Sequence, residues 1–89
     1  MSALKSFKFT PQAYADYVEI KTTNAKMAQK IKDLILSIMD TPFSGLGKPE
    51  ALKYQLSGCW SRRITQQHRL VYRVVDDELQ IISCKYHYE

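Results

Sequence analysis

The 89-residue sequence lacks the features of several protein classes. It has no run of about 18 apolar residues, the length that a membrane-spanning helix requires. Its first residues, MSALKSFKF, hold no uninterrupted apolar stretch of signal-peptide length, so export is not expected. Only three glycines and three prolines are present, and no low-complexity stretch is visible, which argues against a disordered chain. We expect one compact domain over residues 1–89, located in the cytoplasm.

Cysteine and histidine are also scarce, with two of each. Cys59 and Cys84 form no CxxC pair and have no pair of histidines with which to bind zinc. The sequence has no glycine-rich phosphate loop, no dinucleotide fingerprint and no Ser/His/Asp order of a hydrolase. We therefore expect two free thiols, no metal site and no cofactor.

Negative charge is scarce in the middle of the chain. Residues 48–73 contain a single acid, Glu50, and all four arginines of the protein. The cationic residues of this segment are Lys48, Lys53, Arg62, Arg63, Arg69 and Arg73. Because the planar guanidinium suits phosphate, the segment indicates a nucleic acid or another polyanion as partner. On charge alone, a solvated basic face is an equal alternative.

The start of the chain shows the pattern of a strand followed by a helix. Residues 4–9 alternate loosely between apolar and polar, as in a strand. Thr10 followed by Pro11 is typical of a helix start, since the hydroxyl can accept a free N–H and proline has none to lose. A helix from here to about Lys21 would have one face made of Tyr14, Tyr17 and Val18.

A second, longer helix is predicted between Asn24, which can cap it, and Pro42, which must end it. Its apolar residues recur at three- and four-residue steps, as on the buried face of a helix. We expect this stripe to be core: Met27, Ala28, Ile31, Leu34, Ile35, Ile38 and Met39. Residues 40–50, DTPFSGLGKPE, have no period and contain two prolines and two glycines, which predicts a shaped loop.

After this loop the period becomes two, which predicts four strands joined by short turns. The expected strands are 51–56, 59–65, 68–75 and 79–86. Together with the first strand, this four-strand meander would form an antiparallel sheet. The two helices would pack on one of its faces, which makes the fold class α+β. The other face of the sheet would be open to a ligand.

The alternation of the two middle strands decides which side chains share the open face. In residues 59–65 and 68–75 the even-numbered side chains are the more apolar, so both even sets should face the helices. This requires an odd number of loop residues or a bulge, and we predict a three-residue loop or a bulge around Gln66 and Gln67. Arg62 would then lie on the core side, with its guanidinium reaching an edge. The open face would hold Ser61, Arg63, Arg69 and Arg73.

Like charges on neighbouring strands cost stability unless an anion balances them, so we favour an anion site on the open face. If the anion is RNA phosphate, metal-free cleavage next to a 2′-hydroxyl needs a base, cations around the phosphoryl oxygens and an acid for the leaving oxygen. Glu50, whose charged form the nearby cations favour, is the candidate base. Composition alone favours another role for Glu50, that of an ion-pair partner of the basic segment.

The chain ends in KYHYE, residues 85–89, with one of the two histidines between two tyrosines. His87 can serve as the acid, because histidine titrates near neutral pH. Tyr86 and Tyr88 can stack on bases or fill the edge of the sheet. His68, next to a turn on the presumed core side, is expected to be structural.

These residues lie in motifs that resemble the YoeB (Txe) branch of the RelE toxin superfamily. The block TPFSGLGKPEALKYQLSGCWSRRITQQHRLVY at 41–72 and CKYHY at 84–88 carry the resemblance. GKPE, WSRRI, HRLVY and YHY occur in order and at compatible spacing, over roughly half of the chain, and the two predicted helices fit as well. The sequence departs from the branch at Glu89, which follows the final tyrosine, and at Cys59.

The resemblance implies a RelE-like fold and an mRNA interferase, the toxin of a type II toxin–antitoxin pair. Such proteins cut messenger RNA in the ribosomal A site and leave a 2′,3′-cyclic phosphate, or its opened form, and a 5′-hydroxyl. The implied partners are ribosome-bound mRNA with contacts to ribosomal RNA, a YefM- or Axe-like antitoxin, and a second copy in a homodimer. A non-catalytic toxin or binding module that blocks the ribosome or another target is the alternative.

The resemblance also assigns roles residue by residue. The implied catalytic set is Glu50 as general base, His87 as general acid, Arg69 and Arg63 as the transition-state clamp, and Tyr88 as an orienting or stacking group. The implied and expected RNA contacts are Lys48, Lys53, Arg73 and Tyr86. The alternation of the strands and the resemblance both select Arg63, and not Arg62, for the open face.

Overall fold

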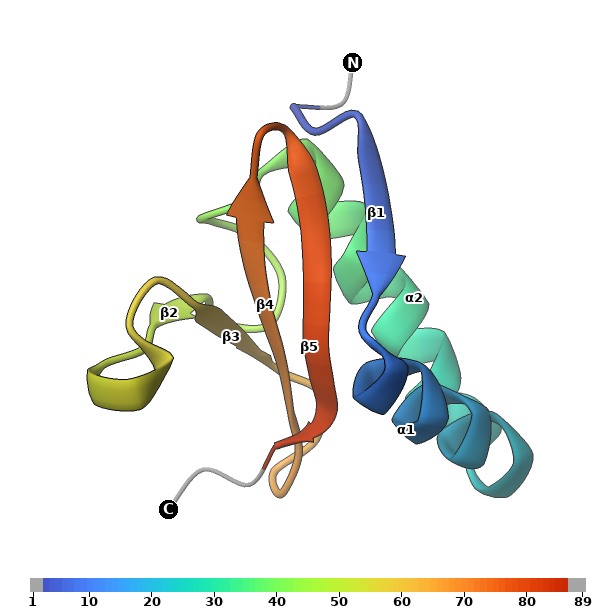
Figure 1. Ribbon diagram of the computed structural model, residues 1–89. Coiled ribbons are helices and arrows are strands. Elements are labelled where there is room, and N and C mark those ends of the chain that lie inside the picture. The colour runs from blue at the N-terminus through green and yellow to red at the C-terminus, as the bar shows by residue number, and fades with distance from the viewer. Residues whose placement is uncertain (1–2, 87–89) are drawn as a thin grey trace.

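The computed structural model describes residues 3–86, in which two helices cover one face of a five-stranded sheet (Figure 1). The helices are α1 (Pro11–Thr23) and α2 (Ala25–Asp40). The strands are β1 (Ser6–Phe9), β2 (Glu50–Ala51), β3 (Trp60–Arg63), β4 (Arg69–Val75) and β5 (Glu78–Tyr86), and a 3-10 helix, η1 (Tyr54–Leu56), follows β2. Their order across the sheet is β1-β5-β4-β3-β2. None of the helices in this described part is long and apolar enough to cross a membrane.

The fold class is α+β as predicted, but the sheet is mixed and not wholly antiparallel. β1 runs parallel to β5, with Ser6 opposite Glu78, whereas the other neighbours are antiparallel. The helices form a hairpin that returns the chain to the start of β1, where the Leu4 amide donates to the Met39 carbonyl (3.0 Å). The pattern of residues 4–9 predicted a strand but contains no information on its neighbour.

The second helix forms as predicted, and the first differs in the face that it buries. The Asn24 side chain caps α2 by accepting from the Met27 amide (3.0 Å), and the predicted apolar stripe of α2 packs in the core. Thr10 caps α1 in the same way, by accepting from the Ala13 amide (3.1 Å). The buried residues of α1 are Ala13, Asp16 and Ile20, whereas Tyr14 is 60% exposed and Val18 is exposed as well.

The predicted loop between the two middle strands is confirmed. Arg63 lies opposite Arg69, and the Ile64 amide donates to the His68 carbonyl (3.0 Å), so residues 65–67 form a three-residue loop. Odd-numbered residues therefore pair with odd-numbered residues across β3 and β4. Arg63 and Arg69 share the face away from the helices, which we call the open face.

The predicted strand over residues 51–56 is mostly wrong. Pairing with β3 stops after Ala51, and the chain then turns into η1. Tyr54 has a φ of 60°, which is incompatible with a strand. The alternating pattern of this segment therefore reflects a turn that exposes Tyr54, and not an extended strand with one buried face.

Cys84 of β5 makes the free energy of unfolding depend on pH in the alkaline range. The thiol is fully buried, and burial together with the charge of Asp16 raises its pKa from about 9 to about 12. In the unfolded chain the thiol ionises near pH 9, so between about pH 9 and 12 the unfolded state binds fewer protons than the folded state. The free energy of unfolding contributed by Cys84 therefore falls as pH rises through this window.

We predict that Cys84→Ala flattens this decline. The variant should be less stable than the parent near neutral pH because it loses core packing. Its free energy of unfolding, from urea titrations at several pH values up to about 11, should fall less steeply with pH than that of the parent. Cys59→Ala keeps the buried thiol and should follow the parent. Parallel curves for the parent and Cys84→Ala would contradict this origin of the pH dependence.

Candidate active site

The loop before β2 is held by one buried arginine. Arg62 lies on the helix side of the sheet and is fully buried, so the prediction that its guanidinium reaches an edge was wrong. Its Nη1 donates to Ser37 Oγ of α2 (2.7 Å) and to the Leu46 carbonyl (3.0 Å). Its Nη2 donates to the carbonyls of Thr41 (2.6 Å) and Ser44 (2.8 Å). The guanidinium thus binds the loop through three backbone oxygens.

Tyr72 of β4 completes this network. Its hydroxyl accepts from Arg62 Nε (3.2 Å) and donates to the Pro42 carbonyl (2.7 Å), so all five N–H groups of the guanidinium have acceptors. Burial raises the pKa of Tyr72, while the hydrogen bond and charge of Arg62 act in the opposite direction. No carboxylate within residues 3–86 bonds to Arg62, so carbonyl dipoles and hydroxyls stabilise its charge in place of water.

Two glycines let the loop pack tightly against this arginine. Gly45 and Gly47 have φ values of 107° and 85°, a region that disfavours side chains. A Cβ on Gly47 would lie 2.7 Å from Leu34 Cδ2. The Gly47 carbonyl also accepts from the Arg63 amide (2.7 Å), which joins the loop to β3. The loop therefore ends at a fixed place on the sheet, where Glu50 begins β2.

Glu50 and Arg69 meet at the open face. Glu50 is the register partner of Ser61 on β3. Arg69 Nη1 lies 3.4 Å from Glu50 Oε1 and 3.3 Å from Ser61 Oγ. The Arg69 side chain is 14% exposed and that of Glu50 is 46% exposed. The pair thus combines a carboxylate that a ligand can reach with a guanidinium that is largely fixed, and Arg63 lies directly opposite Arg69 on β3.

A hollow of about 260 Å³ opens beside Glu50. Its lining residues come from β2, η1 and the end of β5, and they are Glu50, Ala51, Leu52, Lys53, Tyr54, Leu56 and Tyr86. Two of the predicted RNA contacts, Lys53 and Tyr86, therefore line the same hollow as the predicted base. Tyr54 is 87% exposed here, so its ring is available for stacking.

Tyr86 reaches this hollow because the pairing of β4 with β5 shifts twice. Each shift adds one residue to β5, so β5 contains two bulges. As a result Tyr86 lies opposite Arg69. Without the two bulges, the register of the Arg73–Gln80 pair would continue along the strands, and Cys84 would lie opposite Arg69.

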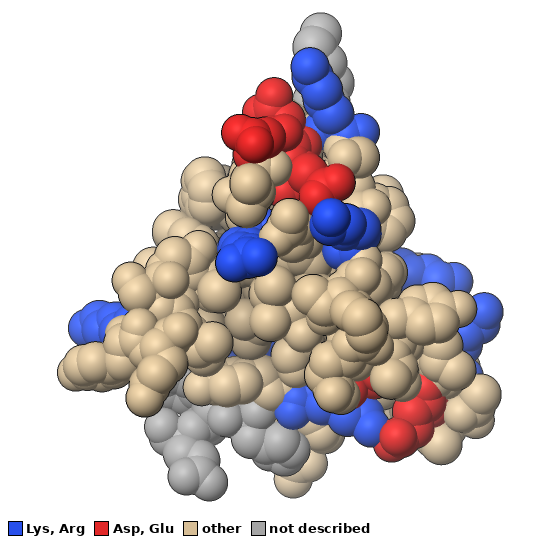
Figure 2. Space-filling model, viewed as in Figure 1, with Lys and Arg blue, Asp and Glu red and all other residues tan. Residues whose placement is uncertain are grey.

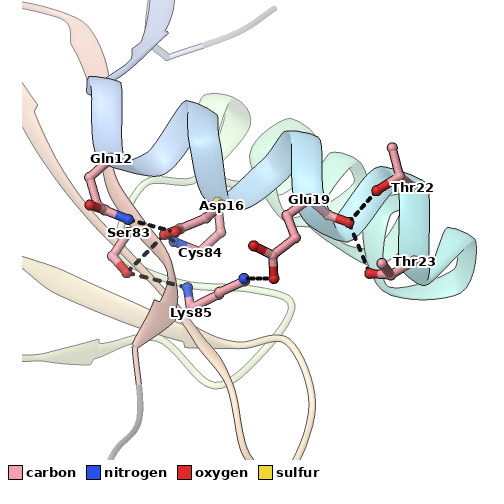
Figure 3. Close-up of polar contacts among 8 residues, drawn as sticks. All are labelled: Gln12, Asp16, Glu19, Thr22, Thr23, Ser83, Cys84 and Lys85. Atoms are coloured by element: carbon pink, nitrogen blue, oxygen red, sulfur yellow. Dashed lines mark hydrogen bonds and ion pairs between the residues drawn. The ribbon is translucent and has the colours of Figure 1, made fainter.

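A buried carboxylate ties the bulged end of β5 to α1. Asp16 is only 5% exposed. Its Oδ2 accepts from the Cys84 backbone N–H (3.1 Å) and from the Ser83 hydroxyl (3.4 Å), and its Oδ1 accepts from Gln12 Nε2 (2.8 Å) (Figure 3). Figure 3 shows the carboxylate pointing from the helix to the backbone of β5.

A second hollow, of about 320 Å³, lies at the end of β3 and is lined by three positively charged residues. Its lining residues are Lys30, Gly47, Lys48, Arg63, Ile64, Thr65 and Gln66. Lys48 and Arg63 are predicted RNA-contacting residues, and Lys30 comes from α2. None of these three cations forms an ion pair within the part of the chain that the structure describes. Three unbalanced cations around one hollow favour an anionic ligand.

Arg73 lies away from the Glu50–Arg69 pair. It follows Arg69 by four residues on the same strand, which is about 13 Å along β4. Its Nε donates to Gln80 Oε1 (2.7 Å). The nearby turn between β4 and β5 carries acidic residues, and Figure 2 shows their surface at that end of the molecule. A contact of Arg73 with RNA stays a prediction.

The terminal residues of the predicted site, His87 and Tyr88, lie outside residues 3–86, so their roles stay predictions. His68 is half-buried, and its Nδ1 lies 3.4 Å from Thr65 Oγ1 at the β3–β4 loop, a position that fits the structural role expected for it. Within the described residues, no group of three His, Cys, Asp or Glu side chains is arranged to hold a metal ion.

Sequence reasoning missed Asp16, Lys30 and Tyr54. Asp16 follows Ala13 by three residues and precedes Ile20 by four, a spacing that places it on the buried stripe of α1. The spacing indicates burial, but a carboxylate is not expected in a core because burial removes its hydration. For Lys30 and Tyr54 the sequence contains no such signal, because their proximity to the site depends on the path of the loop and of η1.

Comparisons with known proteins connect this geometry to one family. The model of the YoeB-like toxin of bacterial type II toxin–antitoxin systems matches residues 9–88. Toxin YoeB of Escherichia coli K12 is 50% identical over 80 residues, which are 90% of this chain and 95% of that protein. A heterotetrameric YoeB–YefM toxin–antitoxin complex from Staphylococcus aureus has a TM-score of 0.86 at 48% identity, over 92% of this chain and 95% of that one. The structure of a YoeB dimer from Staphylococcus aureus has a TM-score of 0.89 at 46% identity, over 98% and 100%.

We predict that Arg62→Met and Arg63→Met, at adjacent positions, have opposite consequences. Arg62→Met leaves carbonyls of the loop without donors in the interior, and it should lower the free energy of unfolding by about 3 kcal/mol. Arg63→Met changes an exposed side chain, and its effect should stay within about 0.5 kcal/mol. Urea denaturation of the parent and both variants at one pH measures the difference. Equal stability of the two variants would contradict the role given to Arg62.

Proposed function

The chain belongs to the family of YoeB-like toxins of bacterial type II toxin–antitoxin systems, and from this premise we propose that it is a ribosome-dependent endoribonuclease. In this proposal it cleaves mRNA in the ribosomal A site and so inhibits translation. The observation that supports the chemistry best is the 3.4 Å approach of Glu50 and Arg69 on the open face, with Arg63 opposite Arg69. In this proposal a base and two guanidinium groups surround one position for a phosphate.

The first half of the reaction uses Glu50 and the arginines. The Glu50 carboxylate takes the proton from a 2′-hydroxyl, and the oxygen attacks the adjacent phosphorus. Arg69 and Arg63 stabilise the negative charge that develops on the non-bridging phosphoryl oxygens. Because Arg69 also contacts Glu50 and Ser61, it holds the base and the phosphate in one geometry.

The second half requires a proton donor for the leaving 5′-oxygen. We assign this role to His87 from the family resemblance, with Tyr88 as the orienting group. The P–O5′ bond breaks as the new P–O2′ bond forms, so the products are a 2′,3′-cyclic phosphate and a 5′-hydroxyl. No step in this scheme changes an oxidation state or uses a cofactor.

We propose that the RNA on either side of the scissile bond binds in the two hollows. In the first, Tyr54 and Tyr86 can stack on bases while Lys53 contacts the backbone. In the second, Lys48, Arg63 and Lys30 can bind a neighbouring phosphate. Lys30 is thereby added to the proposed RNA contacts.

The biological partners follow from the family by analogy. The Staphylococcus aureus relative forms a heterotetramer with YefM, and a dimer of that YoeB has also been solved. We propose that this chain binds a YefM- or Axe-like antitoxin, that it also associates with a second copy of itself, and that it acts in the cytoplasm. A basic toxin surface would suit an antitoxin segment that carries acidic residues.

We predict that Glu50→Gln lowers cleavage of ribosome-bound mRNA on the order of 100-fold or more, because the amide cannot accept the proton. The rate of appearance of 5′-hydroxyl fragments, mapped by primer extension on a defined message, measures the effect. Glu78→Gln is a matched control, because the Lys8–Glu78 pair has the same 3.4 Å separation but lies at the β1–β5 edge. Its cleavage rate should equal that of the parent.

The same assay separates the proposal from its alternative. If the parent stops translation while the message stays intact, the protein is a non-catalytic inhibitor of the ribosome and the proposed chemistry is wrong. If the parent cleaves the message and Glu50→Gln cleaves it equally well, the enzyme is confirmed but another group is the base.

We also predict that Lys30 contributes one phosphate contact. Replacing Lys30 with Gln should reduce the slope of log K against log salt for single-stranded RNA by about 0.7. Lys26, one turn earlier on α2, is exposed and does not line the hollow, so Lys26→Gln should leave the slope unchanged. Fluorescence anisotropy with a fully 2′-O-methylated RNA, which lacks the attacking hydroxyl, gives the binding constants. Equal slopes for both variants and the parent would exclude Lys30 from the interface.

A further inference from the structure

The bulged part of β5 is held by side chains of residues 10–16 and by one of its own side chains, Ser83. Two side chains accept from backbone N–H groups of the second bulge: Asp16 Oδ2 from Cys84 (3.1 Å) and Ser83 Oγ from Lys85 (3.2 Å). Ile82, in the first bulge, has its carbonyl bound by the Thr10 hydroxyl (3.1 Å). Both register shifts therefore have a polar contact with the same segment.

An aspartate at this buried position lowers the stability of the fold unless its charge is compensated. A buried carboxylate loses its hydration, and its charge is tolerated only where hydrogen bonds replace the water. Its neighbours on the buried stripe of α1, Ala13 and Ile20, are apolar, and an apolar side chain at residue 16 would pack against β5 without this cost. The three donors that surround the carboxylate, from Gln12, Ser83 and Cys84, are the compensation.

The Asp16 carboxylate maintains the register of the last residues of β5. With both bulges, Tyr86 lies opposite Arg69 and lines the hollow with Glu50. If the second bulge were lost, β5 would slide by one residue and the side chains after it would change faces. The proposed acid, His87, follows Tyr86 directly in the chain.

We propose that Asp16 is a positioning residue of the active site: it holds the bulge at 83–85 and thereby the register that brings the end of β5 to Arg69. Asp16 does not contact the reacting atoms in this proposal. The inference rests on the proposed function for its catalytic consequence, but the contact between Asp16 and the bulge can be tested without it.

The ion pair between Lys85 and Glu19 is a second link between the same two elements (Figure 3). Both side chains are partly exposed, and pairs of this kind contribute little. It does not satisfy a backbone group of β5. We therefore assign the register to Asp16 and not to this pair.

The first experiment measures the bulge directly by amide hydrogen exchange. In Asp16→Ala, the Cys84 and Lys85 amides should exchange faster on the order of tenfold or more, because one loses its acceptor and the other depends on Ser83. The amides of Val74 and Leu79, which pair in the regular part of β4 and β5, should keep the parent's protection.

Asp33→Ala is the matched control. Asp33 also accepts from a glutamine four residues earlier on its helix, Gln29 (3.0 Å), but it is exposed, and within residues 3–86 its carboxylate has no hydrogen bond to a strand. This variant loses the same kind of helical contact and should leave the exchange of Cys84 and Lys85 unchanged. Unchanged exchange of both amides in Asp16→Ala would overturn the proposal, and so would equal acceleration in Asp33→Ala.

The second experiment measures cleavage of ribosome-bound mRNA. Asp16→Ala should lower kcat on the order of 100-fold, as expected for a displaced catalytic group, while KM changes less than kcat. Asp16→Asn keeps an acceptor oxygen for the Cys84 amide, and the Gln12 amide can rotate to accept from the new NH₂. It should restore kcat to within a few-fold of the parent. Faster exchange in Asp16→Ala with an unchanged kcat would overturn the catalytic role of the bulge, and so would an Asn variant as impaired as Ala.

Two further outcomes have defined meanings. If Asp16→Ala does not fold, Ser83→Ala takes its place. It removes the acceptor of the Lys85 amide and one donor to Asp16, and an unchanged exchange rate at Lys85 would overturn the proposal. If the parent cleaves no mRNA, the proposed function is wrong. The exchange data then still confirm or overturn the role of Asp16 in the bulge.

Discussion

The geometry of this protein depends on a guanidinium that is buried without a carboxylate partner among the described residues. Arg62 is solvated by three loop carbonyls and two hydroxyls, so the loop at 41–47 must take a conformation that presents those oxygens inward. Gly45 and Gly47 provide the backbone angles that make this possible. Because the loop leads directly into β2, the burial of one charge decides where Glu50 lies relative to Arg69.

The same principle acts between α1 and β5, on the same helix-covered face of the sheet. There the buried charge is a carboxylate, Asp16, and the groups that solvate it include a backbone N–H of β5. Apolar packing in the core tolerates small shifts of one element along another, whereas a buried charge loses several kcal/mol when its partners move away. Arg62 and Asp16 thus fix the two segments that converge on the open face, one from β2 and one from β5.

Much of the architecture was predictable because it follows from local periodicity. Three confirmed predictions depend on residues close together in the sequence. They are the apolar stripe of α2, its cap at Asn24, and the odd number of residues in the β3–β4 loop. The parallel pairing of β1 and the bulges of β5 were not predictable, since each depends on which distant segment lies alongside. Within the site, parity and resemblance placed Arg63 and Arg69 correctly on one face, but they did not reveal Asp16, Lys30 or Tyr54.

The sequence by itself determined the α+β class, the core stripe of α2 and the family, because periodicity and ordered motifs are properties of the chain. It also determined that the middle segment carries the positive charge. Only the tertiary structure decided that Arg62 is buried and binds the loop before β2. It also decided that Arg73 lies apart from Glu50 and that Tyr86 lies opposite Arg69. The reason is physical: the hydrogen bonds that position Arg62, Glu50 and the end of β5 join groups far apart in the sequence, and a local pattern does not contain those partners.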